Sequence, residues 1–259
     1  MKVVILCGGM GTRLREETEF RPKPMVEIGE KPILWHIMKT FAHHGFKDFV
    51  LCLGYKGEMI KNYFLNYHRL SRDLTIELGT GNIQLHNQCD EDDWRVTLVD
   101  TGLQAMTGAR VKRVEKYVDG DHFMLTYGDG VSDIDINRLV EFHQSRNTIG
   151  TVTAVSPPSR YGELGILGDR VVSFREKSNS FDSLISGGYF VFHREIFNYL
   201  SADNDCVLER QPLETLSQDG QLSVYMHQGF WQCMDTYRDY QYLNELWNQN
   251  RAQWRVWEA

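Results

Sequence analysis

The chain has 259 residues, of which 42% are hydrophobic and 24% are charged, with 22 glycines and only 6 prolines. These values are typical of a globular protein and exclude a disordered, collagen-like or disulfide-scaffold chain. Lys and Arg together number 28 and Asp and Glu 35, and the resulting net charge of −7 argues against a protein that binds nucleic acid over a broad face.

Cysteine spacing and hydropathy indicate the cellular location of the protein. The five cysteines are scattered, and no pair has the C-x-x-C spacing of a redox or zinc site. The apolar run Val3–Cys7 meets Gly8 after five residues, which is too short for a signal peptide, and no run is long enough to span a bilayer. We therefore expect a cytoplasmic protein with no membrane segment.

Strands and helices are predicted to alternate in the first half of the chain. The elements expected there are strands at 2–7, 46–53, 74–78, 83–86, 96–99 and 122–127, and helices at 33–41, 58–67, 110–118 and 135–146. The strand at 2–7 is apolar almost throughout, as in a parallel sheet that is covered on both faces. The alternation favours an α/β fold with right-handed crossovers.

Strands dominate the second half. They are expected at 151–155, 171–176 and 184–192, with helices near 194–200 and 236–249. We expect one continuous domain over residues 1–259, in which an α/β half (1–150) is followed by a strand-rich half (151–259) that completes a pocket. The tryptophans near the C-terminus could either contact another subunit or pack on the domain itself.

A glycine-rich segment follows the first strand directly: Gly8-Gly9-Met10-Gly11-Thr12-Arg13-Leu14. Glycines at such a place let the backbone approach a ligand and direct N–H groups toward it. Leu14 stands where the dinucleotide fingerprint needs its last glycine, and the Gly-Lys-Ser/Thr of a Walker loop is absent. An ordinary tight turn does not need three glycines and an arginine, so phosphate binding is favoured.

A cationic side chain on a restrained backbone comes next, in Arg21-Pro22-Lys23-Pro24-Met25-Val26. Each proline restricts its own φ and disfavours helix in the residue before it, which predicts an extended backbone at Lys23. This rigid presentation favours phosphate binding over a solvated loop lysine. Arg13 and Lys23 together would supply the positive charge that a triphosphate needs.

Two aspartates are candidates for a metal site. Asp129 lies in Tyr127-Gly128-Asp129-Gly130, which ends a predicted buried strand, and ligands of open α/β sheets bind beyond the carboxyl ends of strands. Asp235 is the second candidate, since Mg²⁺ prefers one or two carboxylates completed by phosphate oxygens. An aspartate before a helix is also a good N-cap, and the sequence alone does not decide between these roles of Asp235. Phe174-Arg175-Glu176-Lys177 by itself indicates only a solvated strand end.

Taken in order, these motifs resemble those of the nucleotidyltransferases that make nucleotide-activated sugars. The segments at 31–38, 54–57, 96–102 and 229–236 resemble the branch of that family that transfers CMP to glucose 1-phosphate, and the similarity covers essentially the whole chain. The resemblance implies a Rossmann-like, mixed and mostly parallel central sheet flanked by helices. It also implies that residues 1–150 mainly bind nucleotide, and that residues 151–259 bind sugar and form a homo-oligomer, a trimer or a hexamer.

The reaction that the resemblance implies is a Mg²⁺-dependent transfer of CMP from CTP to α-D-glucose 1-phosphate, which gives CDP-glucose and pyrophosphate. It implies substrate binding by Leu6, Cys7, Gly8, Gly9, Met10, Glu176, Lys177 and Gly188, and nucleotide binding by Gly11, Thr12, Arg13, Lys23, Ala105, Arg110 and Gly128. Mg²⁺ would be bound by Asp129 and Asp235. The catalytic residues would be Arg13, Lys23, Asp129, Lys177 and Asp235.

Other functions remain open at this stage. Ser186 and Gln211 stand where the family usually has asparagine and glutamate, so the same reaction type with another nucleotide or another phosphorylated acceptor is an alternative. A further alternative is a regulatory subunit that binds sugar nucleotides without catalysis. The cationic and acidic side chains that catalysis would need are all present, and this favours an enzyme.

Overall fold

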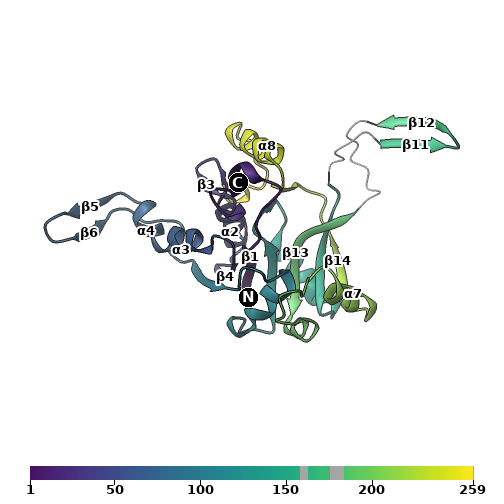
Figure 1. Cartoon of the computed structure of the whole chain (residues 1–259), viewed down its shortest axis with the longest axis horizontal. Helices are drawn as coiled ribbons and strands as arrows, with labels where there is room; N and C mark the ends of the chain where they lie inside the picture. The colour runs from purple at the N-terminus through teal and green to yellow at the C-terminus, as the bar shows by residue number, and fades with distance from the viewer. Residues whose placement is uncertain (158–162, 176–183, 259) are drawn as a thin grey trace.

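A computed structural model describes residues 1–157, 163–175 and 184–258, and a seven-stranded sheet lies at its centre (Figure 1). The strand order is β14-β10-β13-β8-β1-β4-β7. Neighbouring strands are parallel except on the two sides of β13, which runs antiparallel to β8 and β10. The expected mixed, mostly parallel sheet is therefore confirmed. Its strands are β1 (Lys2–Leu6), β4 (Asp48–Leu53), β7 (Arg95–Asp100), β8 (His122–Tyr127), β10 (Gly150–Val155), β13 (Ile185–His193) and β14 (Leu222–Met226).

Helices cover both faces of this sheet. The α-helices are α1 (Arg15–Thr18), α2 (Ile33–His43), α3 (Gly57–Leu65), α4 (Tyr67–Leu70), α5 (Thr107–Arg113), α6 (Ile136–Arg146), α7 (Gln211–Gln218) and α8 (Tyr237–Asn248). Short 3-10 helices are η1 (Lys23–Met25), η2 (Glu115–Tyr117), η3 (Arg194–Tyr199) and η4 (Val256–Glu258).

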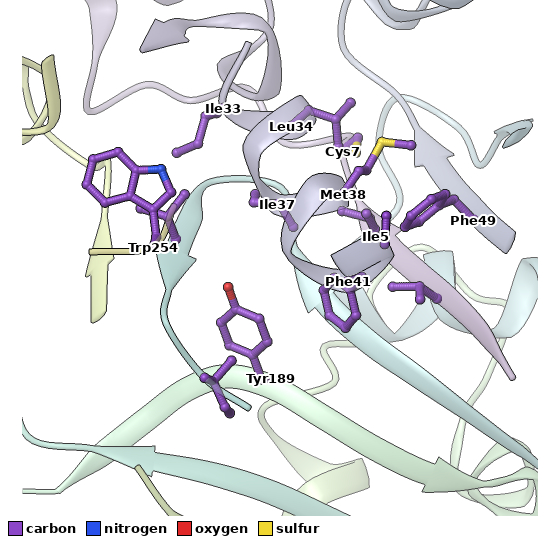
Figure 2. Packing of buried hydrophobic residues seen from close by; sticks show 14 of the residues in the cluster. Ile5, Cys7, Ile33, Leu34, Ile37, Met38, Phe41, Phe49, Tyr189 and Trp254 are labelled. Atoms are coloured by element: carbon purple, nitrogen blue, oxygen red, sulfur yellow. The ribbon is translucent and has the colours of Figure 1, made fainter. Parts of the chain in front are cut away.

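The core divides into two apolar layers because side chains alternate along each strand. Val3 and Ile5 of β1 pack with α2, α6 and α8, whereas Val4 and Leu6 pack with α5, η3 and α7. Figure 2 shows the first layer, where α2 lies over the sheet and directs Ile37 and Phe41 toward it. Burial on both faces explains why the strand at 2–7 is apolar throughout.

Short antiparallel ribbons complete the fold: β2 (Glu27–Ile28) with β3 (Lys31–Pro32), β5 (Leu74–Glu77) with β6 (Asn82–Leu85), β9 (Gly130–Ser132) with β15 (Trp231–Cys233), and β11 (Glu163–Leu167) with β12 (Arg170–Arg175). The β5–β6 ribbon extends away from the body of the protein (Figure 1). Leu74 pairs with Leu85 and Ile76 with Ile83, so one face of that ribbon is aliphatic.

Some expectations from the sequence were wrong or incomplete. The helix expected at 58–67 ends at Leu65, and the separate helix α4 begins at Tyr67. The segment near 194–200 is the 3-10 helix η3, and the short α7, β9, β14 and β15 had not been predicted. Trp254 is fully buried and its indole N–H donates to Nδ1 of His36 at 3.4 Å, so this tryptophan packs on its own domain. Within the part of the chain that the structure describes, no helix has both the length and the apolar composition needed to cross a membrane.

Candidate active site

The carboxyl ends of four parallel strands meet at one edge of the sheet. Leu6 of β1 is in register with Cys52 of β4 and with Tyr127 of β8, and Leu53 of β4 is in register with Asp100 of β7. A cavity of about 340 Å³ opens at this edge. Of the residues expected in the site, those that line it are Leu6, Cys7, Gly8, Gly9, Gly11, Thr12, Arg13, Lys23, Ala105, Arg110, Gly128 and Asp129.

Arg110 holds the loops of this edge together. It comes from α5, is 5% exposed, and donates from Nη1 to the carbonyl of Leu53 at 3.0 Å and to that of Gly102 at 2.8 Å. Nη2 donates to the carbonyl of Gly8 at 3.0 Å. One guanidinium thus joins the segments that follow β4, β7 and β1. Burial lowers the pKa of Arg110 from its ordinary value, although the group stays charged at neutral pH.

The glycine-rich segment needs two of its glycines for packing. A Cβ on Gly8 would lie 2.2 Å from Nη1 of Arg110, and Gly11 has a φ of +63° and faces Thr18 at 2.7 Å. A Cβ on Gly9 would have no neighbour within 4 Å. Gly8 therefore lets Arg110 reach the loop, while Gly9 leaves open space above the cavity.

The backbone at Lys23 differs from the expectation. Pro22 is extended, but Lys23 begins the 3-10 turn η1, in which Met25 N–H donates to the Pro22 carbonyl at 2.8 Å. The prediction of an extended Lys23 was wrong because a single tight turn tolerates Pro24, whose missing N–H is not needed there. The turn places the Lys23 side chain in the cavity wall, where it is 10% exposed.

Asp129 and Asp235 lie side by side, as the sequence analysis required. Nζ of Lys23 donates to Oδ2 of Asp129 at 2.7 Å and to Oδ1 of Asp235 at 2.5 Å, and Nη1 of Arg13 donates to Oδ2 of Asp235 at 2.7 Å. Although 222 residues separate them in the sequence, Arg13 and Asp235 are in direct contact. These four side chains form one ionic cluster beside the glycine-rich segment: Arg13, Lys23, Asp129 and Asp235.

The β9–β15 ribbon fixes the spacing of the two aspartates. β9 begins directly after Asp129, and β15 ends two residues before Asp235. Met234 N–H donates to the Asp129 carbonyl at 2.8 Å, which closes the ribbon at the end that carries both carboxylates. Trp231 anchors the ribbon to β13, because its indole N–H donates to the Gly187 carbonyl at 2.7 Å.

The N-cap alternative for Asp235 is excluded. Helix α8 is capped by Thr236, whose hydroxyl accepts from Asp239 N–H at 3.3 Å while the Asp239 carboxylate accepts from Thr236 N–H at 2.8 Å. This capping box leaves the Asp235 carboxylate to the ionic cluster.

The cluster is electrostatically self-neutralised. Burial by itself would lower the pKa of Lys23, but the charges and hydrogen bonds of Asp129 and Asp235 outweigh it and raise the pKa. For Asp235, burial would raise the pKa, and the contacts of Lys23 and Arg13 outweigh it and lower the pKa. Both shifts favour the charged forms of Lys23 and Asp235 at neutral pH. Cys7, by contrast, is 1% exposed, and burial raises the pKa of its thiol, which argues against a nucleophile.

The carboxylates suit a divalent cation that is shared with a substrate. Their oxygens contact the same ammonium, so they are close enough for one small ion to contact both. Mg²⁺ in such sites is typically held by one or two carboxylates together with phosphate oxygens and water. Within the described residues, no group of three or more His, Cys, Asp or Glu is arranged to hold a metal alone. The residues present thus fit an ion that arrives with phosphate.

The remaining expected residues lie elsewhere. Met10 is exposed. Gly188 does not line the cavity but packs against Tyr127, which does: a Cβ on Gly188 would lie 2.6 Å from the Tyr127 ring. Glu176 and Lys177 lie outside the described residues. Gln211 lines a different cavity of about 510 Å³ between η3 and α7, which lacks the glycine-rich segment and the ionic cluster.

Sequence analysis missed part of the cavity wall: Pro24, Met106, Thr107 and Tyr127. A signal for Tyr127 was present, because the residue directly before Gly128 ends a predicted strand and so lies at the ligand-binding edge. Met106 and Thr107 carried no comparable signal.

Known proteins resemble this chain in both sequence and fold. The family model described as nucleotidyl transferase matches residues 2–240. The chain is 50% identical to glucose-1-phosphate cytidylyltransferase of Salmonella typhimurium over 260 residues, covering all of both chains. It is 42% identical to a probable glucose-1-phosphate cytidylyltransferase of Bacillus subtilis, covering 99% of this chain and all of the other. The crystal structure of HddC from Yersinia pseudotuberculosis has the same fold, with a TM-score of 0.70 at 23% identity over 95% of this chain and 99% of that one.

The close approach of Gly8 and Arg110 makes a testable prediction. Gly8→Ala places a methyl group on the guanidinium, and overpacking of this kind lowers the free energy of unfolding by about 1–3 kcal/mol. Gly9→Ala is the matched control, because its methyl group enters open space, and it should change the free energy by less than about 0.5 kcal/mol. Urea denaturation measures both. Equal stability of the two variants would contradict the packing described here.

Proposed function

This chain belongs to the nucleotidyl transferase family, and on that premise we propose that it transfers CMP from CTP to α-D-glucose 1-phosphate, giving CDP-glucose and pyrophosphate. Relatives that carry the name glucose-1-phosphate cytidylyltransferase match the chain over its full length at 50% and 42% identity. The observation that carries the proposal is the contact of one ammonium, that of Lys23, with both Asp129 and Asp235 beside the glycine-rich segment.

The reaction needs alignment and countercharge rather than a protein nucleophile. An oxygen of the sugar phosphate attacks the α-phosphorus of CTP, a new P–O bond forms, and the bond from that phosphorus to the bridging oxygen of the β-phosphate breaks, so that pyrophosphate leaves with the electron pair. Both reactants are polyanions, and their mutual repulsion opposes the approach. Fixed positive charges in a cleft reduce that repulsion, which is the main contribution a protein makes to such a transfer.

We assign the positive charges to Arg13, Lys23 and Lys177. In the structure Arg13 and Lys23 contact carboxylates, so those carboxylates compete with phosphates for the two cations. Asp129 and Asp235 would hold a bound Mg²⁺, which would withdraw charge from the phosphate oxygens. With the carboxylates paired to the metal, Arg13 and Lys23 would be freer to bind phosphate. Metal binding and nucleotide binding would then depend on each other.

The other site residues are proposed to contact either the nucleotide or the sugar. We propose that the loop from Leu6 to Met10 contacts substrate, that Gly11, Thr12, Ala105 and Gly128 contact the nucleotide, and that Glu176 and Gly188 contact the sugar. Arg110 is proposed to act on the nucleotide, with support from its position in the cavity wall and from its contacts to the loop carbonyls. Residues 1–150 would form mainly the nucleotide half and residues 151–259 the sugar half.

The location and assembly of the protein are also part of the proposal. A cytoplasmic enzyme is supported by the five cysteines, each of which is a free thiol. A trimer or hexamer is supported by the aliphatic face of the β5–β6 ribbon, where Ile76 is 48% exposed and Ile83 is 39% exposed. Neither nucleic acid nor membrane is expected as a partner.

Activity tests the proposed reaction directly. Pyrophosphate release should require CTP, Mg²⁺ and glucose 1-phosphate together, and a panel of other nucleotides and sugar phosphates tests the alternative substrates.

Asp129→Asn and Asp235→Asn should each lower turnover about 100-fold or more, because each removes a charge from the proposed metal site. Asp93→Asn is the control, since Asp93 pairs with Lys47 in an exposed ion pair elsewhere. Wild-type turnover in either site variant would exclude the assignment. Binding without turnover under every pairing would favour a regulatory subunit.

Light scattering tests the assembly. The chain has a mass of 30.2 kDa, and the particle in solution should have three or six times that mass. Replacing Ile76 and Ile83 by Lys should shift the particle toward the monomer, because charged side chains on the aliphatic face oppose its burial. A monomeric wild type would contradict the proposed oligomer.

A further inference from the structure

Tyr127 forms a fixed part of the nucleotide cavity. It is the last residue of β8, directly before Gly128 and Asp129. Its ring fills the space that a side chain at Gly188 would occupy, and Gly188 has a φ of +77°, a conformation that favours glycine. Phe190 packs edge-on against the same ring, with the ring centres 6.3 Å apart. The ring is therefore held by β13 while its hydroxyl remains available for a partner.

That partner is the carboxylate of Glu209, from the segment between η3 and α7. The Tyr127 hydroxyl donates to Oε1 of Glu209, and the Thr107 hydroxyl donates to Oε2 at 2.6 Å. Burial, and then the charge of Glu209, raise the pKa of Tyr127 far above its ordinary value, so the phenol keeps the proton that it donates. Glu209 does not itself line the cavity, but both of its partners do.

The segment that carries Glu209 is attached to the start of α5. Met106 N–H donates to the Asn204 carbonyl at 2.8 Å, and Leu208 N–H donates to the Thr107 hydroxyl at 3.0 Å. A Cβ on Gly108 would lie 2.6 Å from Sγ of Cys206, so the two segments are in close contact. The start of α5 and this segment are therefore joined by backbone contacts, and the side chain of Glu209 links them to β8.

We propose that Glu209 is a positioning residue that sets the width of the nucleotide cavity. The inference rests on the proposed function, because it takes the cavity to bind CTP. Thr107, the first residue of α5, lies in one wall of the cavity, and Tyr127, the last residue of β8, lies in another. Glu209 joins these walls through its two carboxylate oxygens and does not itself line the cavity. Without it, the walls separate more freely and must be ordered when CTP binds, which weakens binding without removing any group that contacts the reacting phosphates.

The effect should fall on CTP binding and not on the chemical step. Loss of a hydrogen-bonded link of this kind corresponds to roughly a threefold to tenfold weaker affinity for CTP. Turnover at saturating substrate and the KM for glucose 1-phosphate should change less than about twofold, since Lys23, Asp129 and Asp235 are not touched.

Calorimetry with CTP and Mg²⁺, without acceptor, tests the proposal on Glu209→Ala and Glu209→Gln. Glu209→Ala should weaken CTP binding. Glu209→Gln should remain close to wild type, because the amide oxygen accepts from Thr107 while the amide nitrogen donates to the Tyr127 oxygen. Asp219→Ala is the matched control: it removes an exposed carboxylate that accepts from the Tyr199 hydroxyl at 2.9 Å, beside the other cavity. It should leave CTP binding unchanged.

The possible outcomes are distinct. If the wild type does not bind CTP, the proposed function is wrong. If the wild type binds CTP and Glu209→Ala binds it equally well, the inference about Glu209 is wrong while the function stands. A purely structural role would lower the stability of Glu209→Ala without a selective change in CTP affinity. Tyr127→Phe breaks the side of the link that reaches β8, and combining it with Glu209→Ala should add nothing to the loss of affinity.

Discussion

The contact of the Lys23 ammonium with two carboxylates is the interaction on which the site depends. Asp129 and Asp235 are like charges at close range, and their repulsion is offset because a buried cation lies against both and Arg13 contacts one of them. A protein of net charge −7 thereby keeps cations beside a cavity that is proposed to receive polyanions. In the proposed function, a metal that arrives with phosphate would compete with these cations for the carboxylates.

The scaffold explains how residues so distant in the sequence meet. Parallel strands bring the glycine-rich segment and Asp129 to one edge of the sheet, and the β9–β15 ribbon carries Asp235 to the same place. Arg110 joins the loops that follow three of the strands, and Glu209 joins the two walls of the cavity behind them. Arg110 and Glu209 thus connect the segments that carry the proposed catalytic residues.

Much of this arrangement could be predicted from the sequence, because its signals were local. The apolar strands and glycine-rich turns indicated an α/β sheet, and the strand-edge rule placed Asp129 correctly. The order of the motifs pointed to Asp235, but only the capping box of Thr236 and Asp239 in the structure excludes the N-cap alternative. Glu209 could not be found in this way, since its role depends on a contact with Tyr127 across 82 residues and no local pattern marks it. The turn at Lys23 was wrong because proline statistics favour extended chain there, whereas one 3-10 turn satisfies the same restraints.

The proposed exchange of partners at Lys23 can be measured through the affinity of the nucleotide-free protein for Mn²⁺, used as a probe of the proposed magnesium site and followed by electron paramagnetic resonance. Lys23→Met leaves both carboxylates without their shared cation, so this variant should bind Mn²⁺ about tenfold more tightly than the wild type, or tighter still. Lys47→Met makes the same change in net charge at an exposed pair with Asp93 and should leave the affinity unchanged. With CTP present the order should reverse, because Lys23 is then needed for the phosphates. Equal or weaker Mn²⁺ binding by nucleotide-free Lys23→Met would contradict the account.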